Sequence, residues 1–207
     1  MNLFFVLEVI GTIAFAISGA LVAVEKKMDL FGVAMLGMTT AVGGGIFRDL
    51  LLGVTPPSAL QNPVYAVISI LVSLVIFLPS IRSLLRSNQR MYDIIMLIMD
   101  SIGLGVFTVV GVQAANSLTE GYNVFLAAFV GVITGVGGGI VRDLFAGDTP
   151  KILIKHFYAC ASLIGALVYI AWWMVTGNEH GMIVGAVVTM VLRILAAHYR
   201  WGLPKAK

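Results

Sequence analysis

A polar motif occurs twice in this chain, and each copy lies inside an apolar run long enough to span a lipid bilayer. The first copy reads Gly43-Gly44-Gly45-Ile46-Phe47-Arg48-Asp49-Leu50, and the second, at an offset of 94 positions, reads Gly137-Gly138-Gly139-Ile140-Val141-Arg142-Asp143-Leu144. Three successive glycines weaken a helix, and an Arg-Asp pair is costly in hydrocarbon. Repetition of both features indicates a pathway through the membrane for an ion or a solute.

The composition predicts an integral membrane protein. Hydrophobic residues make up 59% of the chain and charged residues only 11%, whereas a soluble domain is about 25% charged. The apolar runs are continuous rather than alternating, so we expect an all-α membrane protein rather than a barrel. Each spanning helix needs ~20 apolar residues. The predicted spans are Leu3–Val24, Leu30–Val54, Pro63–Ile81, Tyr92–Ala115, Tyr122–Ala146, Phe157–Val175 and Gly181–His198.

The repeat extends beyond the glycine motif. Matching residues at an offset of 92 are Glu8, Gly11, Phe15 and Gly19 in the first span and Asp100, Gly103, Phe107 and Gly111 in the fourth. Because a unit of three crossings is odd, the second copy must be inverted relative to the first. We therefore expect a first three-helix repeat over 1–83, a cytoplasmic linker over 84–91, a second, inverted repeat over 92–176, and a seventh helix with a cytoplasmic tail over 177–207.

Basic residues predict the orientation of the chain. The loops after spans one, three and five and the C-terminal tail hold Lys26, Lys27, Arg82, Arg86, Arg90, Lys151, Lys155, Arg200, Lys205 and Lys207, and the opposite loops hold none. Cytoplasmic loops carry the excess of lysine and arginine. The N-terminus is therefore expected outside and the C-terminus in the cytoplasm. Arg193, near the end of the seventh span, is interpreted as extending to the cytoplasmic interface.

Counting residues along the helices pairs the charges within the spans. At 1.5 Å per residue, Glu8 and Arg48 both lie ~7 Å from the outer end of their helices. Asp100 and Arg142 lie ~6–12 Å from the inner end of theirs. We expect two symmetry-related ionic clusters, with Asp49 and Asp143 as caps or second partners. Either these clusters line a pathway as pore-lining groups or a gate, or they are structural salt bridges that stabilise the fold; both interpretations stay open.

The glycine triplets have two interpretations. Consecutive glycines face all sides of a helix, which favours a kink or a break whose released carbonyl groups line a polar path for cations. Thr39, Thr40 and Thr134 lie one turn before the triplets. The alternative is close packing of helices, which is the better explanation for the isolated glycines of spans one and four.

Other classes of function lack support. Neither glycine motif contains the Gly-Lys-Ser/Thr of a phosphate-binding loop, and no serine, histidine and acid share one membrane depth, so we do not expect an enzyme. His156, His180 and His198 show no metal-ligand spacing, and Cys160 is the sole cysteine. The basic residues sit in short loops facing a membrane surface, which does not suggest nucleic-acid binding. No cofactor is expected.

Seven helices, an inverted three-helix repeat and paired Gly-Gly-Gly-x-x-Arg-Asp motifs resemble the prokaryotic members of the trimeric intracellular cation channel family. The same motif defines a bacterial glycine-transporter membrane domain. The resemblance implies a homotrimer in the inner membrane of a prokaryote, with one water-filled pore per protomer and helices two and five kinked at the glycines. Animal members carry a Lys-Glu-Val signature and bind a phosphoinositide; Glu25-Lys26-Lys27 does not match it, so lipid regulation is not carried over.

Three hypotheses follow. The first is a passive channel for monovalent cations, K⁺ or Na⁺, with potassium as the main ion that the resemblance implies. The second is a carrier for a small zwitterion such as glycine, whose carboxylate and ammonium groups could bind to the Arg-acid pairs. The third is a purely structural membrane protein.

Overall fold

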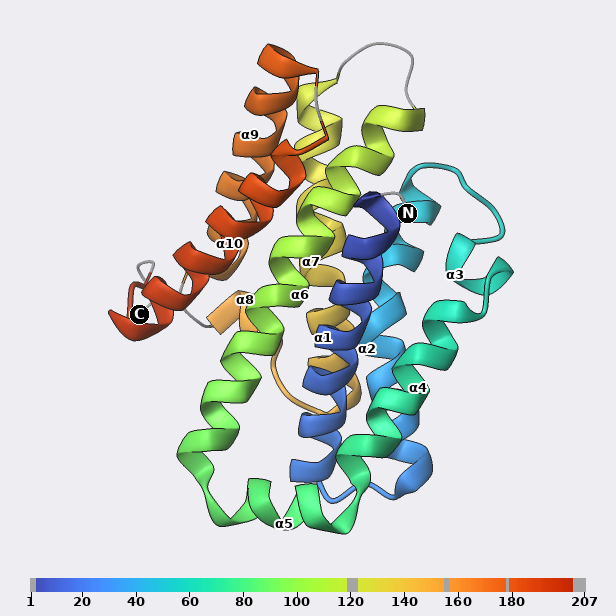
Figure 1. Ribbon diagram of the computed structural model, residues 1–207, viewed down its shortest axis with the longest axis vertical. Helices are drawn as coiled ribbons and strands as arrows, with labels where there is room; N and C mark the ends of the chain where they lie inside the picture. Colours follow the sequence, from blue (N-terminus) through green and yellow to red (C-terminus); the bar gives the residue numbers. More distant parts are fainter. Residues whose placement is uncertain (1–2, 119–122, 155–156, 178, 203–207) are drawn as a thin grey trace.

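The computed structural model describes residues 3–118, 123–154, 157–177 and 179–202, and within these ranges the regular secondary structure is entirely helical (Figure 1). Tyr122, Lys155, His156, Lys205 and Lys207, which the sequence analysis used, lie outside these ranges. The helices are α1 Leu3–Glu25, α2 Leu30–Leu51, α3 Ser58–Gln61, α4 Val64–Phe77, α5 Pro79–Ser87, α6 Gln89–Leu118, α7 Val124–Phe145, α8 Lys151–Ile154, α9 Tyr158–Thr176 and α10 Gly181–His198.

Six of these helices are long and apolar enough to cross a membrane, and counting the bent pair of α4 and α5 as one span gives seven. The helices α1, α2, α6, α7, α9 and α10 coincide with six predicted spans to within a few residues at each end. In Figure 1 the long helices form one bundle, with α9 and α10 side by side along one flank. The seven-helix membrane fold expected from the sequence is confirmed.

The third predicted span, Pro63–Ile81, is wrong at its C-terminal end. Helix α4 ends at Phe77, and α5 begins at Pro79 with its axis turned by 69°. Proline lacks the N–H group that a continuing helix needs, and its ring clashes with the preceding turn. Helix α5 therefore runs across one end of the bundle and joins α4 to α6 (Figure 1). The stretch 84–91, expected to be a linker, is mostly helical.

The short helices α3 and α8 were not expected from the sequence. Each follows an Arg-Asp motif by a few residues, α3 beginning at Ser58 and α8 at Lys151. Their equivalent positions in the two halves match the repeat of Thr55-Pro56 in Thr149-Pro150. The repeat thus includes the connection after each motif as well as the spans.

Reciprocal contacts in the core show the inverted repeat directly. A Cβ atom at Gly103 would lie 2.1 Å from the ring of Phe15, and one at Gly11 would lie 3.0 Å from the ring of Phe107. The two rings pack against each other with their centroids 5.3 Å apart. Because each phenylalanine fills the space left by a glycine of the other half, α1 and α6 are related by a pseudo-two-fold axis between the rings.

The glycine triplets lie where α2 and α7 cross. A Cβ atom at Gly44 would lie 2.2 Å from the carbonyl oxygen of Thr134, and one at Gly138 would lie 2.3 Å from that of Thr40. Both helices continue through the triplets without interruption. Neither helix is therefore broken at its triplet in this conformation, whereas a kink there stays a prediction, and close packing explains Gly44 and Gly138.

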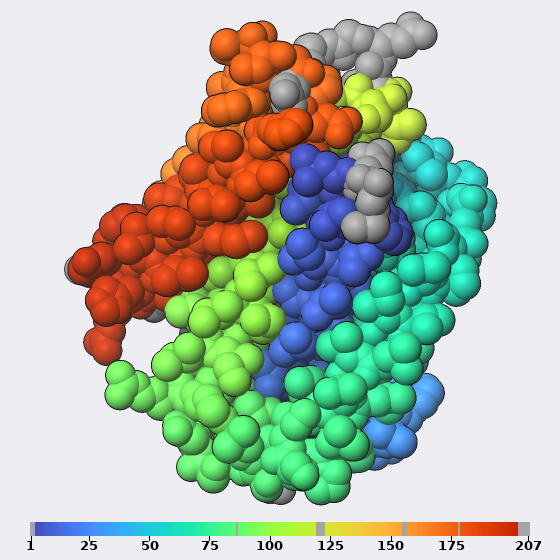
Figure 2. Space-filling model, in the orientation of Figure 1, coloured from blue at the N-terminus to red at the C-terminus, as the bar shows by residue number. Residues whose placement is uncertain are grey.

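Figure 2 shows how α1, α4 and α5 of the first repeat pack on this face of the bundle, beside α6 and α10. Side chains of α1 fill the space between α4 and α6, and α5 covers one end. The loop after α1 and the loop after α7 meet at a single end, because Lys26 Nζ and Asp148 Oδ1 lie 2.5 Å apart. That contact agrees with a topology in which both loops lie on the same side of the membrane.

Candidate functional site: two ionic clusters within the bundle

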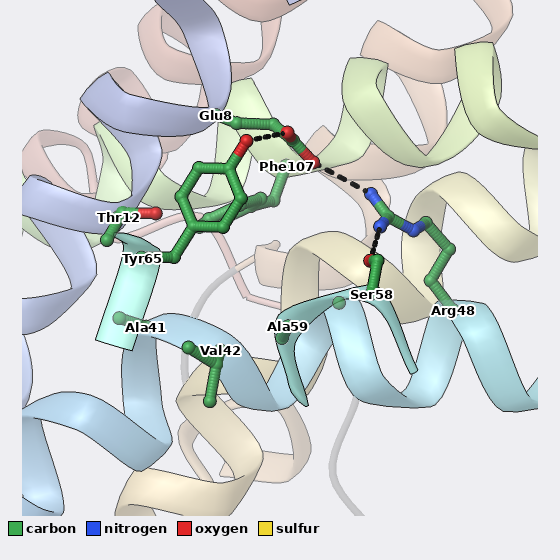
Figure 3. A pocket seen from close by; sticks show the side chains of 10 residues that line it. Glu8, Thr12, Ala41, Val42, Arg48, Ser58, Ala59, Tyr65 and Phe107 are labelled. Carbon is green, nitrogen blue, oxygen red and sulfur yellow. Dashed lines mark hydrogen bonds and ion pairs between the residues drawn. The ribbon is translucent and has the colours of Figure 1, made fainter. Parts of the chain in front are cut away.

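The first ionic cluster comprises Glu8, Arg48, Asp49, Ser58 and Tyr65. Arg48 Nε donates to Asp49 Oδ1 at 2.8 Å, and Arg48 Nη1 lies 3.2 Å from Glu8 Oε1. The remaining terminal nitrogen of Arg48 donates to Ser58 Oγ at 3.3 Å. The Tyr65 hydroxyl donates to the second carboxylate oxygen of Glu8. Figure 3 shows the side chains of Glu8, Arg48, Ser58 and Tyr65 converging from α1, α2, α3 and α4.

A small cavity adjoins this cluster. Its lining includes Glu8 and Arg48, the small side chains of Val42 and Ala59, and Phe107 of α6 from the second half (Figure 3). Gly45 also lines it. The cavity offers about 20 Å³ to the centre of a water molecule, and a single water needs roughly 10–15 Å³. It therefore has room for a water molecule or a bare ion beside the carboxylate of Glu8 and the guanidinium of Arg48.

The second ionic cluster comprises Ser18, Asp100, Arg142 and Asp143. Arg142 Nε donates to Asp143 Oδ1 at 2.9 Å, and Arg142 Nη1 donates to Asp100 Oδ1 at 2.6 Å and to the Ser18 hydroxyl. Each half thus joins the acid of its first helix to the arginine of its second. The pairings of Glu8 with Arg48 and of Asp100 with Arg142, predicted from helix depth, are confirmed as ion pairs.

The two motif aspartates are second partners of the arginines, and each also contacts the start of the short helix that follows it. Asp49 Oδ2 accepts a hydrogen bond from the backbone N–H of Ser58 at 2.7 Å, and Asp143 Oδ2 accepts one from that of Lys151 at 2.7 Å. A carboxylate satisfies the free N–H groups at the start of a helix and interacts favourably with its dipole. Each aspartate therefore fixes its arginine and the following short helix together.

The clusters differ in their access to solvent. The side chain of Arg142 is fully buried, while those of Arg48 and Glu8 are 8% and 13% exposed. Buried ion pairs need partners for every polar group, because an uncompensated charge costs several kcal/mol. In the first cluster, each guanidinium nitrogen of Arg48 has a hydrogen-bond or ion-pair partner. The second leaves Arg142 Nη2 and the Tyr158 hydroxyl without a hydrogen-bond partner among the described residues.

Tyr158 occupies the place in the second half that Tyr65 has in the first, at an offset of 93 positions. The Tyr65 hydroxyl donates to the carboxylate of Glu8. The acid that matches Glu8 in the second half is Asp100, whose side chain is one methylene group shorter. The guanidinium of Arg193 lies over the ring of Tyr158, 4.9 Å from its centroid, and the arginine is 5% exposed. The interpretation that Arg193 extends to the interface is therefore wrong: the packing of α10 on α9 and α6 holds it inside the bundle.

The three threonines before the triplets donate within their own helices. Thr39 Oγ1 donates to the carbonyl oxygen of Met35 at 2.8 Å, Thr40 Oγ1 to that of Leu36 at 2.5 Å, and Thr134 Oγ1 to that of Val130 at 2.6 Å. This is the usual back-bonding of threonine inside helices. Their role as pore-lining groups stays a prediction.

The structure distributes the six triplet glycines over three environments. Gly43 lies against the side chain of Val141, and Gly44, Gly137 and Gly138 are buried at the crossing of α2 and α7. Gly45 lines the cavity, and a Cβ atom there would meet nothing within 4 Å. A Cβ atom on Gly139 would lie 3.1 Å from the Tyr158 hydroxyl. Gly45 and Gly139 therefore adjoin the two clusters.

Both halves of the chain, each with its ionic cluster, match a known protein family. The family profile described as "Glycine transporter" matches residues 5–80 and again residues 97–174, one match to each half. The chain belongs to this family. Two relatives are the inner membrane protein YadS of Escherichia coli strain K12, 37% identical over 96% of this chain and 93% of YadS, and the membrane protein YvgT of Bacillus subtilis strain 168, 37% identical over 96% of this chain and 94% of YvgT.

Solved structures of similar fold are cation channels. A structure from a study of conductance through TRIC cation channels is 41% identical, with a TM-score of 0.83, over 100% of this chain and 98% of that one. The TRIC trimeric intracellular cation channel orthologue from Rhodobacter sphaeroides is 32% identical, with a TM-score of 0.85, over 97% and 100%. The structural relatives of the present chain are thus channels rather than enzymes, as the sequence indicated.

Several residues of the site were not singled out from the sequence. Ser18, Ser58, Tyr65 and Tyr158 are small or aromatic polar residues of a kind common at membrane interfaces, and nothing local marks them as partners of buried charges. The repeat carries the only signal for the tyrosines, because Tyr65 and Tyr158 occupy equivalent positions at an offset of 93. Arg193 was noticed, but its burial depends on packing between helices.

Proposed function

We propose that this protein is a passive channel for monovalent cations, with potassium as the main permeant ion. It works as a homotrimer with one polar pore per protomer, in the inner membrane of a prokaryote. Its N-terminus lies outside and its C-terminus in the cytoplasm. The similarity to TRIC cation channels over nearly the whole chain supports this proposal.

The observation that carries the proposal is the pair of ionic clusters, one in each half, on the helices that cross at the glycine triplets. Each cluster places carboxylates beside an arginine within a membrane-spanning bundle. Charges within spans are expensive and mark ion or substrate pathways. Carboxylates favour cations over anions along such a route.

This conformation is closed along the proposed route. The Phe15 and Phe107 rings fill the space between the two clusters and are 0% and 5% exposed. The backbones of α2 and α7 touch at Gly44 and Gly138. A hydrophobic constriction of this kind stops ions by excluding water. Opening then requires α2 and α7 to separate or the two rings to move aside.

Recording in planar bilayers tests the proposal. Purified trimer under a potassium/chloride gradient should give unitary currents that reverse near the potassium equilibrium potential. The proposal would be falsified if correctly assembled protein gave neither single-channel currents nor potassium flux in liposomes. The oligomeric state is measured on the same sample by light scattering in detergent.

A carrier for a small zwitterion is the second candidate, and two observations favour it. The family profile bears the description of a glycine transporter, and the small cavity brings Arg48 close to Glu8. An arginine binds a carboxylate and a glutamate binds an ammonium group. Saturable uptake of radiolabelled glycine without unitary currents selects the carrier. A structural protein, in contrast, shows neither activity in any variant.

A further inference from the structure

The seventh span supplies a positive charge that the repeat itself does not provide. Helix α10 has no counterpart in the first half, and it packs on α9 and α6 of the second half. Within it Arg193 is buried, and its guanidinium covers the ring of Tyr158. The first half has an equivalent tyrosine, Tyr65, but no arginine over its ring among the described residues.

Arg193 has no carboxylate partner among the described residues. The ion pairs of this region join Arg142 to Asp100 and to Asp143. Arg193 Nε and Nη1 are buried and lack a hydrogen-bond partner in the described part of the chain. A buried arginine without a partner is costly, and a π-face compensates it only in part. Its charge is therefore not cancelled by a direct contact.

The net charge of the side chains around each cluster differs between the two halves because of Arg193. Glu8 and Asp49 against Arg48 leave the first cluster with one negative charge in excess. Asp100 and Asp143 against Arg142 would leave the second cluster with the same excess. Arg193 cancels that excess, and Lys151, partly buried at the start of α8, adds a further positive charge close to Asp100. The two ends of the pseudo-symmetric pathway therefore differ by at least one elementary charge.

We propose that Arg193 sets the charge of the second-cluster end of the pathway and makes conduction unequal in the two directions. This inference rests on the proposed channel function. A cation entering past the first cluster is attracted by its excess acid, whereas one entering past the second meets a site without that excess. In symmetric KCl the wild-type current–voltage relation is therefore curved, with entry from the first cluster favoured.

Neutralising Arg193 removes the difference. Arg193→Met keeps most of the length of the side chain and restores one excess acid to the second cluster. At ~10 Å from the ion, with an effective dielectric constant between about 20 and 80, one charge changes the local cation population roughly two- to fifteenfold. We expect the current entering from the second-cluster end to rise within that range, and the ratio of currents at opposite voltages to approach one.

Arg82 offers a matched control. It also lies over an aromatic ring, that of Phe77 at 4.8 Å, but belongs to the surface helix α5. Arg82→Met removes the same charge and the same type of contact outside the bundle, so rectification should persist. Arg193→Lys keeps the charge and should also rectify. Assembly of each variant is checked by size-exclusion chromatography before recording.

The outcomes separate this inference from the proposed function. If wild type conducts and Arg193→Met rectifies to the same degree, Arg193 does not set the charge of that end. A linear wild-type current–voltage relation overturns the inference without any variant, even where Arg193→Met does not assemble. If no variant and no wild-type sample conducts as a folded trimer, the channel function itself fails.

Discussion

Replacing Gly44 by alanine tests whether the crossing of α2 and α7 depends on direct backbone contact. The added Cβ would lie 2.2 Å from the carbonyl oxygen of Thr134 and 3.4 Å from the backbone nitrogen of Gly138. A carbon and an oxygen approach to about 3.3 Å without repulsion, so the helices must separate by roughly 1 Å. Neither atom belongs to a flexible side chain that could rotate away.

The cost follows from this displacement. Overpacking of a well-filled interior typically destabilises by about 1–3 kcal/mol, and the separation also loosens the reciprocal contact of Gly138 with Thr40. Alanine has a higher helix propensity than glycine, by about 1 kcal/mol, which offsets part of the loss. We expect Gly44→Ala to lower the free energy of unfolding by up to about 2 kcal/mol net.

Gly45 is the matched control for stability, because it lies in the same helix one position further on. A Cβ atom there would meet nothing within 4 Å, so Gly45→Ala should raise stability by up to about 1 kcal/mol through helix propensity. The assay is thermal unfolding of the detergent-solubilised protein, followed by size-exclusion chromatography. Equal midpoints for the two variants would show that the crossing tolerates separation and that the close-packing explanation is wrong.

Three further substitutions probe the clusters and the surface, each measured in the same unfolding assay. Arg142→Met should cost about 3–5 kcal/mol, because it leaves Asp100 and Asp143 buried without their cation, and Arg48→Met should cost less because its partner Glu8 is partly exposed; equal losses would contradict the difference in burial. Tyr65→Phe removes the hydrogen bond to Glu8 and should cost about 1.5–3 kcal/mol, and an unchanged midpoint would mean that this bond is not formed. Lys26→Ala breaks only an exposed ion pair and should change stability by no more than about 1 kcal/mol, so a large loss would assign the loop contact a structural role.

The amino-acid sequence determined which helices cross the membrane and at what depth their charges lie. Depth along a helix follows from counting residues at a fixed rise, so the pairing of acids with arginines in both halves could be predicted. The inverted repeat followed from the odd number of crossings in a duplicated unit. The bend at Pro79 was also visible in principle, because proline interrupts a helix wherever its N–H group is needed.

Only the tertiary structure decided which face of each helix meets which neighbour. The rotation of a helix about its axis depends on how ridges and small residues fit across all contacts at once. A glycine triplet faces every side, so sequence could not show that Gly44 and Gly138 serve the crossing while Gly45 opens to a cavity. For the same reason Arg193, one turn from a helix end, could equally face lipid headgroups or the interior, and the packing of α10 on α9 and α6 placed it over Tyr158.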